Sequence, residues 1–133
     1  MRPVFTPPSE VAEYRIVRLL GRGAMGQVYL AHDTLLDRPV AIKFISTIDP
    51  DPLLRERFLI EARAIARLSH PNVVAIYRVS QMGAWPYLVS EYLRGESLEK
   101  LEKPLPWERA LAIGVGIAAG LAAAHKRGVL HRD

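Results

Sequence analysis

The chain alternates short strand-like segments with longer helix-like segments. Polar and apolar residues alternate, with many β-branched and aromatic side chains, in segments that predict strands. Apolar residues recur at intervals of three and four where helices are predicted. The predicted strands are 14–20, 27–31, 39–45, 73–79 and 85–92, and the predicted helices are 52–68, 97–103 and 107–126. The pattern therefore predicts a chain that mixes a sheet with helices.

The first helix has its own start signal. Asp51 is a favourable N-cap residue, and Pro52 suits the first helical position. Glu61 lies in the middle of this helix. Taken alone, Glu61 is best explained as a solvated surface charge that pairs with Arg57 or Arg63.

The last helix is unusually apolar. Residues 110–124 contain no charged or strongly polar side chain. A membrane-spanning helix needs about 20 such residues, and this run is shorter. The glycines at 114, 116 and 120 each lower helix propensity by about 1 kcal/mol relative to alanine. The segment therefore predicts a core helix, apolar on nearly all sides because other helices surround it.

Composition narrows the class of protein. The chain has 133 residues, of which 50% are hydrophobic, enough for one domain core. It has no cysteine, which suits a reducing compartment, and residues 1–9 carry no secretion signal, so we expect a cytoplasmic protein with a loose, proline-rich N-terminal tail. The net charge of +4 comes from dispersed basic residues without a base-stacking aromatic cluster, which argues against nucleic-acid binding.

A glycine triplet, Gly21-x-Gly23-x-x-Gly26, is the main candidate for chemistry. Dinucleotide-binding folds use the same spacing, but there the third glycine opens a helix. Here strand-like segments flank the triplet, so the glycines lie at the tip of a hairpin, and Lys43 follows in a third strand. Glycines let backbone N–H groups approach phosphate oxygens closely, and a lysine supplies a balancing charge. The alternative is a glycine-rich hairpin with a surface lysine.

The combined motifs resemble those of the eukaryotic-type protein kinase family over residues 14–133. They are the loop Gly-Arg-Gly-Ala-Met-Gly-Gln-Val, the run Val-Ala-Ile-Lys, the turn Leu-Ser-His-Pro-Asn-Val-Val and the terminal His-Arg-Asp. The sequences of these motifs look most like those of bacterial serine/threonine kinases. The resemblance implies an α+β fold, with an N-lobe of a five-stranded antiparallel sheet and one helix, αC, followed by the first helices of an α-helical C-lobe. It also implies three parts: a tail at 1–13, the N-lobe at 14–95 and the start of the C-lobe at 96–133.

The resemblance implies an ATP site between these lobes. Lys43 would contact the α- and β-phosphates and Val28 the adenine. Ser90 would be the gatekeeper behind the adenine, while the Glu91 carbonyl and the Leu93 N–H would hydrogen-bond its edge. The full set of implied nucleotide-binding residues is Leu20, Gly21, Arg22, Gly23, Ala24, Met25, Gly26, Gln27, Val28, Ala41, Lys43, Ser90, Glu91 and Leu93.

The resemblance also assigns catalytic roles. Glu61 would pair with Lys43, and Asp133 would accept the proton of the substrate hydroxyl. The asparagine and the Asp-Phe-Gly segment that hold Mg²⁺ in the family would follow Asp133, so we expect the 133-residue chain to be inactive alone. Three hypotheses stay open: the ATP-binding part of an active serine/threonine kinase, a non-catalytic nucleotide-binding or regulatory module, and a fragment without function.

The expected partners follow from these hypotheses. They are ATP with Mg²⁺ and a protein substrate of the full-length kinase, with no nucleic acid and no membrane segment. The apolar helix would be αE of the C-lobe, buried by helices outside this chain. We therefore expect the isolated chain to self-associate through residues 107–127, to exchange this helix between copies or to leave it frayed.

Overall fold

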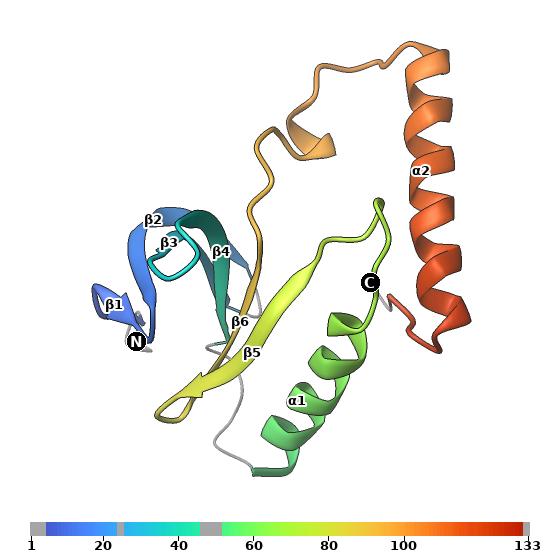
Figure 1. The fold of residues 1–133 in the computed structure, drawn as a ribbon. Helices are drawn as coiled ribbons and strands as arrows, with labels where there is room; N and C mark the ends of the chain where they lie inside the picture. Colours follow the sequence, from blue (N-terminus) through green and yellow to red (C-terminus); the bar gives the residue numbers. More distant parts are fainter. Residues whose placement is uncertain (1–4, 24–25, 46–51, 132–133) are drawn as a thin grey trace.

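A computed structural model describes residues 5–23, 26–45 and 52–131. Within them, six strands form one antiparallel sheet in the order β1-β2-β3-β4-β6-β5. Helix α1 lies against β5, while α2 stands apart from the sheet beside the loop that follows α1 (Figure 1). The elements are β1 (Glu10–Val11), β2 (Tyr14–Gly23), β3 (Gly26–Asp33), β4 (Arg38–Ile45), α1 (Pro52–Ala66), β5 (Ile76–Met82), β6 (Trp85–Glu91), η1 (Leu98–Lys100) and α2 (Trp107–Lys126).

The predicted α+β class is confirmed, and all five predicted strands are present. Several predicted bounds differ by two or three residues: β2 extends to Gly23, β5 covers Ile76–Met82 and α1 ends at Ala66. Strand β5 begins at Ile76 rather than at Val73, because residues 70–73 form a turn in which the Val73 N–H donates to the His70 carbonyl. The helix predicted at 97–103 is reduced to the single 3₁₀ turn η1.

Residues 5–13 of the N-terminal tail contact the sheet, although the tail was expected to be loose. Strand β1 adds a sixth strand beside β2, and the Ile16 N–H donates to the Ser9 carbonyl at 2.9 Å. Upstream of β1, the Phe5 ring lies 5.1 Å from the Phe44 ring and 4.8 Å from the Trp85 ring, centroid to centroid. An aromatic side chain that can cover an open end of a core gains enough from burial to order the segment that carries it.

The hydrophobic core lies on one face of the sheet. Alternation along each strand sends every second side chain to this face, and the bulkiest residues, Phe44 and Tyr87, are fully buried there with ring centroids 5.8 Å apart. The cluster consists of Val11, Tyr14, Ala31, Val40, Ile42, Phe44, Tyr87 and Val89. The opposite face of β2, β3 and β4 is therefore left for other uses.

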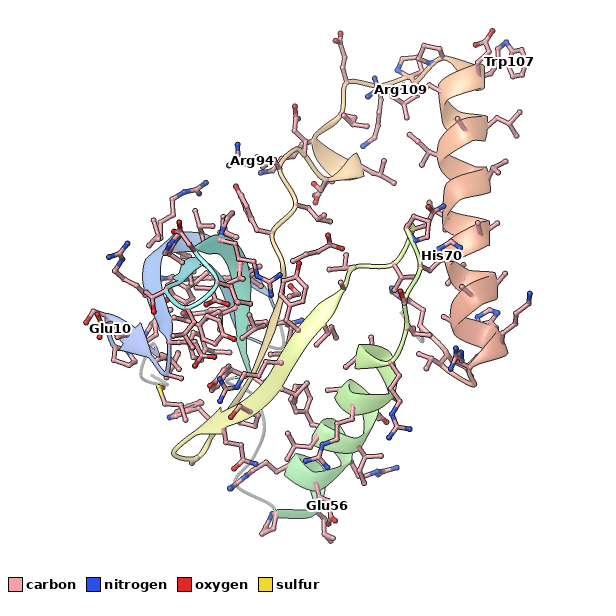
Figure 2. All side chains as sticks on the ribbon, in the orientation of Figure 1. Glu10, Glu56, His70, Arg94, Trp107 and Arg109 are labelled. Carbon is pink, nitrogen blue, oxygen red and sulfur yellow. The ribbon has the colours of Figure 1, made fainter. Side chains whose placement is uncertain are left out.

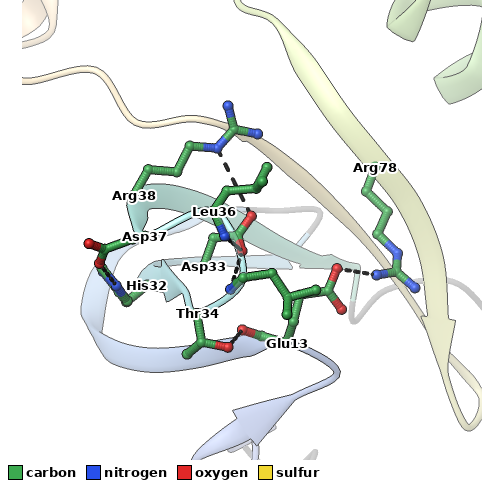
Figure 3. A network of polar contacts seen from close by, with 9 residues as sticks. Glu13, His32, Asp33, Thr34, Leu36, Asp37, Arg38 and Arg78 are labelled. Carbon is green, nitrogen blue, oxygen red and sulfur yellow. Dashed lines mark hydrogen bonds and ion pairs between the residues drawn. The ribbon is translucent and has the colours of Figure 1, made fainter.

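A polar network ties the β3–β4 turn to the β1–β2 turn and to β5 (Figure 3). The buried Asp33 carboxylate accepts hydrogen bonds from the Leu35 and Leu36 N–H groups, both at 3.0 Å, which fixes the turn. Thr34 donates to the Glu13 carbonyl at 2.7 Å, and Arg78 pairs with the Glu13 carboxylate at 2.6 Å. A hydrogen bond from its own backbone N–H, followed by the Arg78 contact, holds the pKa of Glu13 below its usual value.

Helix α2 has the predicted bounds but few neighbours. Gly120 is its one buried residue, and Leu111, Val115 and Ile117 are each at least half exposed. Figure 2 shows Trp107 and Arg109 at the start of this helix, far from the sheet. Its length and a mean hydropathy of 1.3 would suit a membrane span, a criterion that core helices of soluble proteins also meet. Burial by further C-lobe helices and self-association through 107–127 both stay predictions.

The loop between α1 and β5 is the described point of close contact with α2. The Asn72 side-chain amide donates to the Gly116 carbonyl at 2.8 Å, and the Asn72 N–H donates to His70 Nδ1 at 3.0 Å. Figure 2 shows His70 in this loop, beside α2. A β-carbon added to Gly120 would lie 2.6 Å from the Asn72 carbonyl oxygen. The glycines that weaken α2 as an isolated helix thus form the surface on which this loop rests.

Candidate nucleotide-binding site

Strand register places the predicted site residues on the face opposite the core. Val28 on β3 is the partner of Lys43 on β4, so their side chains share a face. Leu30 is the partner of Ala41 in the same way, and Ala41 is in turn the partner of Ser90 on β6. Since Ile42 and Phe44 are buried in the core, alternation sends Ala41 and Lys43 to the other face. The structure therefore brings Val28, Ala41, Lys43 and Ser90 together on one surface.

A cavity of about 410 Å³ opens on this surface where the sheet meets the segment after β6. Its volume is within the range of small-molecule sites. Four of its lining residues were predicted from the sequence: Leu20, Ala41, Glu91 and Leu93. The structure therefore joins the end of β2, the middle of β4 and the segment that leaves β6 around one space.

The three glycines of the triplet differ in their surroundings. An added β-carbon would meet nothing within 4 Å at Gly21 or Gly23, so the backbone there borders open space. At Gly26 it would lie 1.9 Å from the Phe44 carbonyl oxygen, and the backbone has a φ of +151°. Gly21 and Gly23 thus leave room for a bound group, whereas Gly26 is needed for close packing of β3 on β4.

Glu91 is anchored by the loop that precedes β5. Its N–H donates to the Ala75 carbonyl, and its side-chain Oε1 accepts from the Ala75 N–H, each at 2.9 Å. The Ser90 hydroxyl donates to the Glu91 carbonyl at a long 3.4 Å. This double link holds the edge of the cavity that was predicted to face the adenine, and leaves Ser90 as a small residue beside it.

Some predicted site residues are not brought together or lie outside the described part. Among the ion pairs within 4.0 Å in the described residues, Lys43–Glu61 does not occur, and the Glu61 side chain is exposed on α1. Their pairing stays a prediction. Ala24, Met25 and the predicted catalytic Asp133 lie outside the described residues. The remaining predicted residues, Arg22 and Gln27, are cross-strand partners next to the glycine loop.

Four residues that line the cavity were not predicted: Arg18, Tyr92, Gly95 and Lys100. Tyr92 and Gly95 lie in the same segment as the predicted residues Glu91 and Leu93, so the prediction could have been extended to them. Arg18 could not be found by alternation, because the ladder between β2 and β3 shifts register between Ile16 and Arg18. A bulge of this kind moves a side chain to the other face without leaving a pattern in the sequence.

The fold and this surface together define a protein kinase N-lobe joined to the beginning of a C-lobe. The model of the protein kinase domain family matches residues 14–133, and the chain belongs to that family.

The relatives that it resembles are bacterial serine/threonine kinases. The chain is 45% identical to the serine/threonine-protein kinase PknK of Mycobacterium tuberculosis over 95% of its own length and 12% of the relative. It is 40% identical to PknD of Chlamydia muridarum over 90% of its length and 14% of that protein. The crystal structure of the Mycobacterium tuberculosis PknI kinase domain matches with a TM-score of 0.79 and 31% identity, over 97% of this chain and 56% of that one. The chain thus spans about an eighth of these curated relatives.

Proposed function

We propose that this chain is the nucleotide-binding part of a serine/threonine protein kinase that transfers the γ-phosphate of ATP to protein hydroxyls. The observation that carries the proposal is the register that sets Val28, Ala41 and Lys43 on one face, where Ala41 also lines a cavity edged by Glu91 and Leu93. An adenine in that cavity would be covered by apolar side chains and hydrogen-bonded along its edge by the backbone of residues 91 and 93. Its phosphates would extend toward Lys43 and the open backbone at Gly21 and Gly23.

The residues present fit ATP better than they fit its metal ion. The glycine backbone supplies N–H donors, and Lys43 supplies a fixed charge, which is what a polyphosphate requires. Among the described residues, no group of three or more His, Cys, Asp or Glu side chains could hold a metal ion. We therefore derive no step through Mg²⁺ from these residues. The part played by this chain is to bind and orient the nucleotide, and positioning of that kind contributes much of the rate in phosphoryl transfer.

Replacement of Lys43 tests the proposal. In the full-length protein, Lys43→Ala should leave the fold intact and lower phosphoryl transfer by orders of magnitude, because Lys43 supplies charge and position rather than core packing. Lys126→Ala, which removes an exposed lysine at the end of α2, is the matched control and should keep normal turnover. Near-normal transfer by the Lys43 variant would refute the role assigned to this lysine.

The 133-residue chain alone should bind nucleotide weakly and transfer no phosphate. Incubation with labelled ATP, Mg²⁺ and a generic protein substrate measures this directly. The alternative function is a non-catalytic nucleotide-binding or regulatory module. A full-length protein that binds ATP but phosphorylates neither itself nor any substrate would favour that alternative.

A further inference from the structure

Two cations from distant parts of the chain line the cavity. Arg18 comes from β2 and Lys100 from η1, and both are exposed. Gly95, which belongs to the segment that connects β6 to η1, also lines the cavity. Neither cation belongs to the phosphate-binding group, since Lys43 and the glycines of the loop do not line this space in the described residues. The two cations are therefore distinct from the residues proposed to bind the phosphates.

Charge balance within the cavity favours an anion. Among the described lining residues, Glu91 is the one acid. Its carboxylate already accepts a hydrogen bond from the Ala75 N–H at 2.9 Å. Arg18 makes no ion pair within 4.0 Å among the described residues, and neither does Lys100. The two cations are thus available to a ligand.

A bulge in β2 directs Arg18 to this surface. Ile16 is the partner of Ala31 in the core, whereas Arg18 is the partner of Leu30, which shares its face with Ala41. Strict alternation would have placed residues 16 and 18 on the same face. Bulges are over-represented beside active sites, where they re-aim a side chain, and Arg18 is re-aimed here from the core face to the cavity.

We propose that Arg18 and Lys100 form a cationic subsite that binds a carboxylate carried by an adenine-based ligand beyond its ring. The proposal rests on the nucleotide function proposed above. If the adenine N6 and N1 atoms bond the backbone of residues 91 and 93, then C2, the next ring atom, points along the chain toward Gly95. An acidic group on a short arm at C2 would then stay within the cavity that Gly95, Arg18 and Lys100 line. The subsite therefore selects adenine ligands with an acidic C2 substituent over neutral ones.

The test compares three ligands on the full-length protein by calorimetry: ADP, ADP with a carboxyethylthio group at C2, and its neutral carbamoylethylthio twin. The acid should bind about tenfold more tightly than the amide at low salt, the product of two exposed ion pairs worth roughly threefold each. The preference should shrink as ionic strength rises to about 0.5 M, because exposed pairs are screened.

Substitutions then locate the subsite. Arg18→Gln and Lys100→Gln should each reduce the acid-to-amide preference about threefold, and the double variant should abolish it. Arg15→Gln is the matched control, because Arg15 is exposed on the same strand but does not line the cavity, and it should keep the full preference. Equal binding of acid and amide, or a preference that survives in the double variant, overturns the subsite. Failure of ADP itself to bind would refute the nucleotide function and the subsite with it.

Discussion

Asn72 approaches Gly120 so closely that a β-carbon on Gly120 would lie 2.6 Å from the Asn72 carbonyl oxygen. The neighbouring hydrogen bond from the Asn72 side chain to the Gly116 carbonyl, at 2.8 Å, fixes the loop on the same surface of α2. Two glycines one helical turn apart thus accept the loop that follows α1. This contact between the Asn72 loop and α2 links the helix to the strand β5 that follows the loop.

Gly120→Ala should weaken this contact. Alanine would add about 1 kcal/mol of helix propensity, but its β-carbon must displace a backbone atom, so we expect a net loss of stability of about 1–3 kcal/mol. Gly114→Ala is the control, because nothing lies within 4 Å of a β-carbon there, and it should stabilise the protein. Urea unfolding of the full-length protein measures both. Equal stabilisation by the two alanines would show that the loop does not rest on α2 in solution.

Gly26→Ala should be the most damaging change in the glycine triplet. The new β-carbon would lie 1.9 Å from the Phe44 carbonyl oxygen, at a residue whose φ of +151° suits glycine alone. We expect a loss of more than about 2 kcal/mol, measured by chemical unfolding. Gly23→Ala, in open space, serves as the comparison and should change stability by less than about 1 kcal/mol. Comparable losses at both positions would contradict the different roles assigned to these glycines.

Phe5→Ala should destabilise the sheet although it lies outside the family match. The half-buried ring contacts Phe44 and Trp85, so its removal should cost about 1–2 kcal/mol, less than a fully buried phenylalanine. Thr6→Ala changes an exposed neighbour and should be neutral. Thermal unfolding followed by tryptophan fluorescence reports on Trp85 as well as on global stability. A neutral Phe5 variant would mean that the tail is loose, as the sequence suggested.

Glu13→Gln should remove a pH-dependent part of the stability. Because the pKa of Glu13 is lowered in the folded state, its contribution is present above its usual value of 4.5 and is lost as pH falls through the lowered pKa. The exposure of its partner Arg78 limits the expected loss at pH 7 to about 1 kcal/mol. Unfolding free energies of wild type and variant should therefore converge as the pH falls below the lowered pKa of Glu13. Glu10→Gln, at an exposed position on β1, should show no such difference.

Most of the fold and about half of the cavity could be predicted from the sequence. Alternation and glycine spacing indicated the hairpin of β2 and β3, and Pro106 before a long apolar run located α2. Strand β1 was not predicted, because its two residues are too few to show an alternating pattern and lie in a proline-rich tail. Arg18 and Lys100 escaped for different reasons. The first depends on a bulge, and the second on how the chain folds back after β6.

The sheet order has a consequence for synthesis of the chain. All six strands and α1 lie within the first 91 residues, and each strand pairs with its neighbour in the chain except where β4 meets β6 across α1. Contacts between near neighbours form with little loop-closure cost, and N-terminal parts generally fold first during translation. The sheet can therefore be complete while α2 is still inside the ribosome. The helix would then emerge beside a finished surface, with the Asn72 loop already in place to receive it.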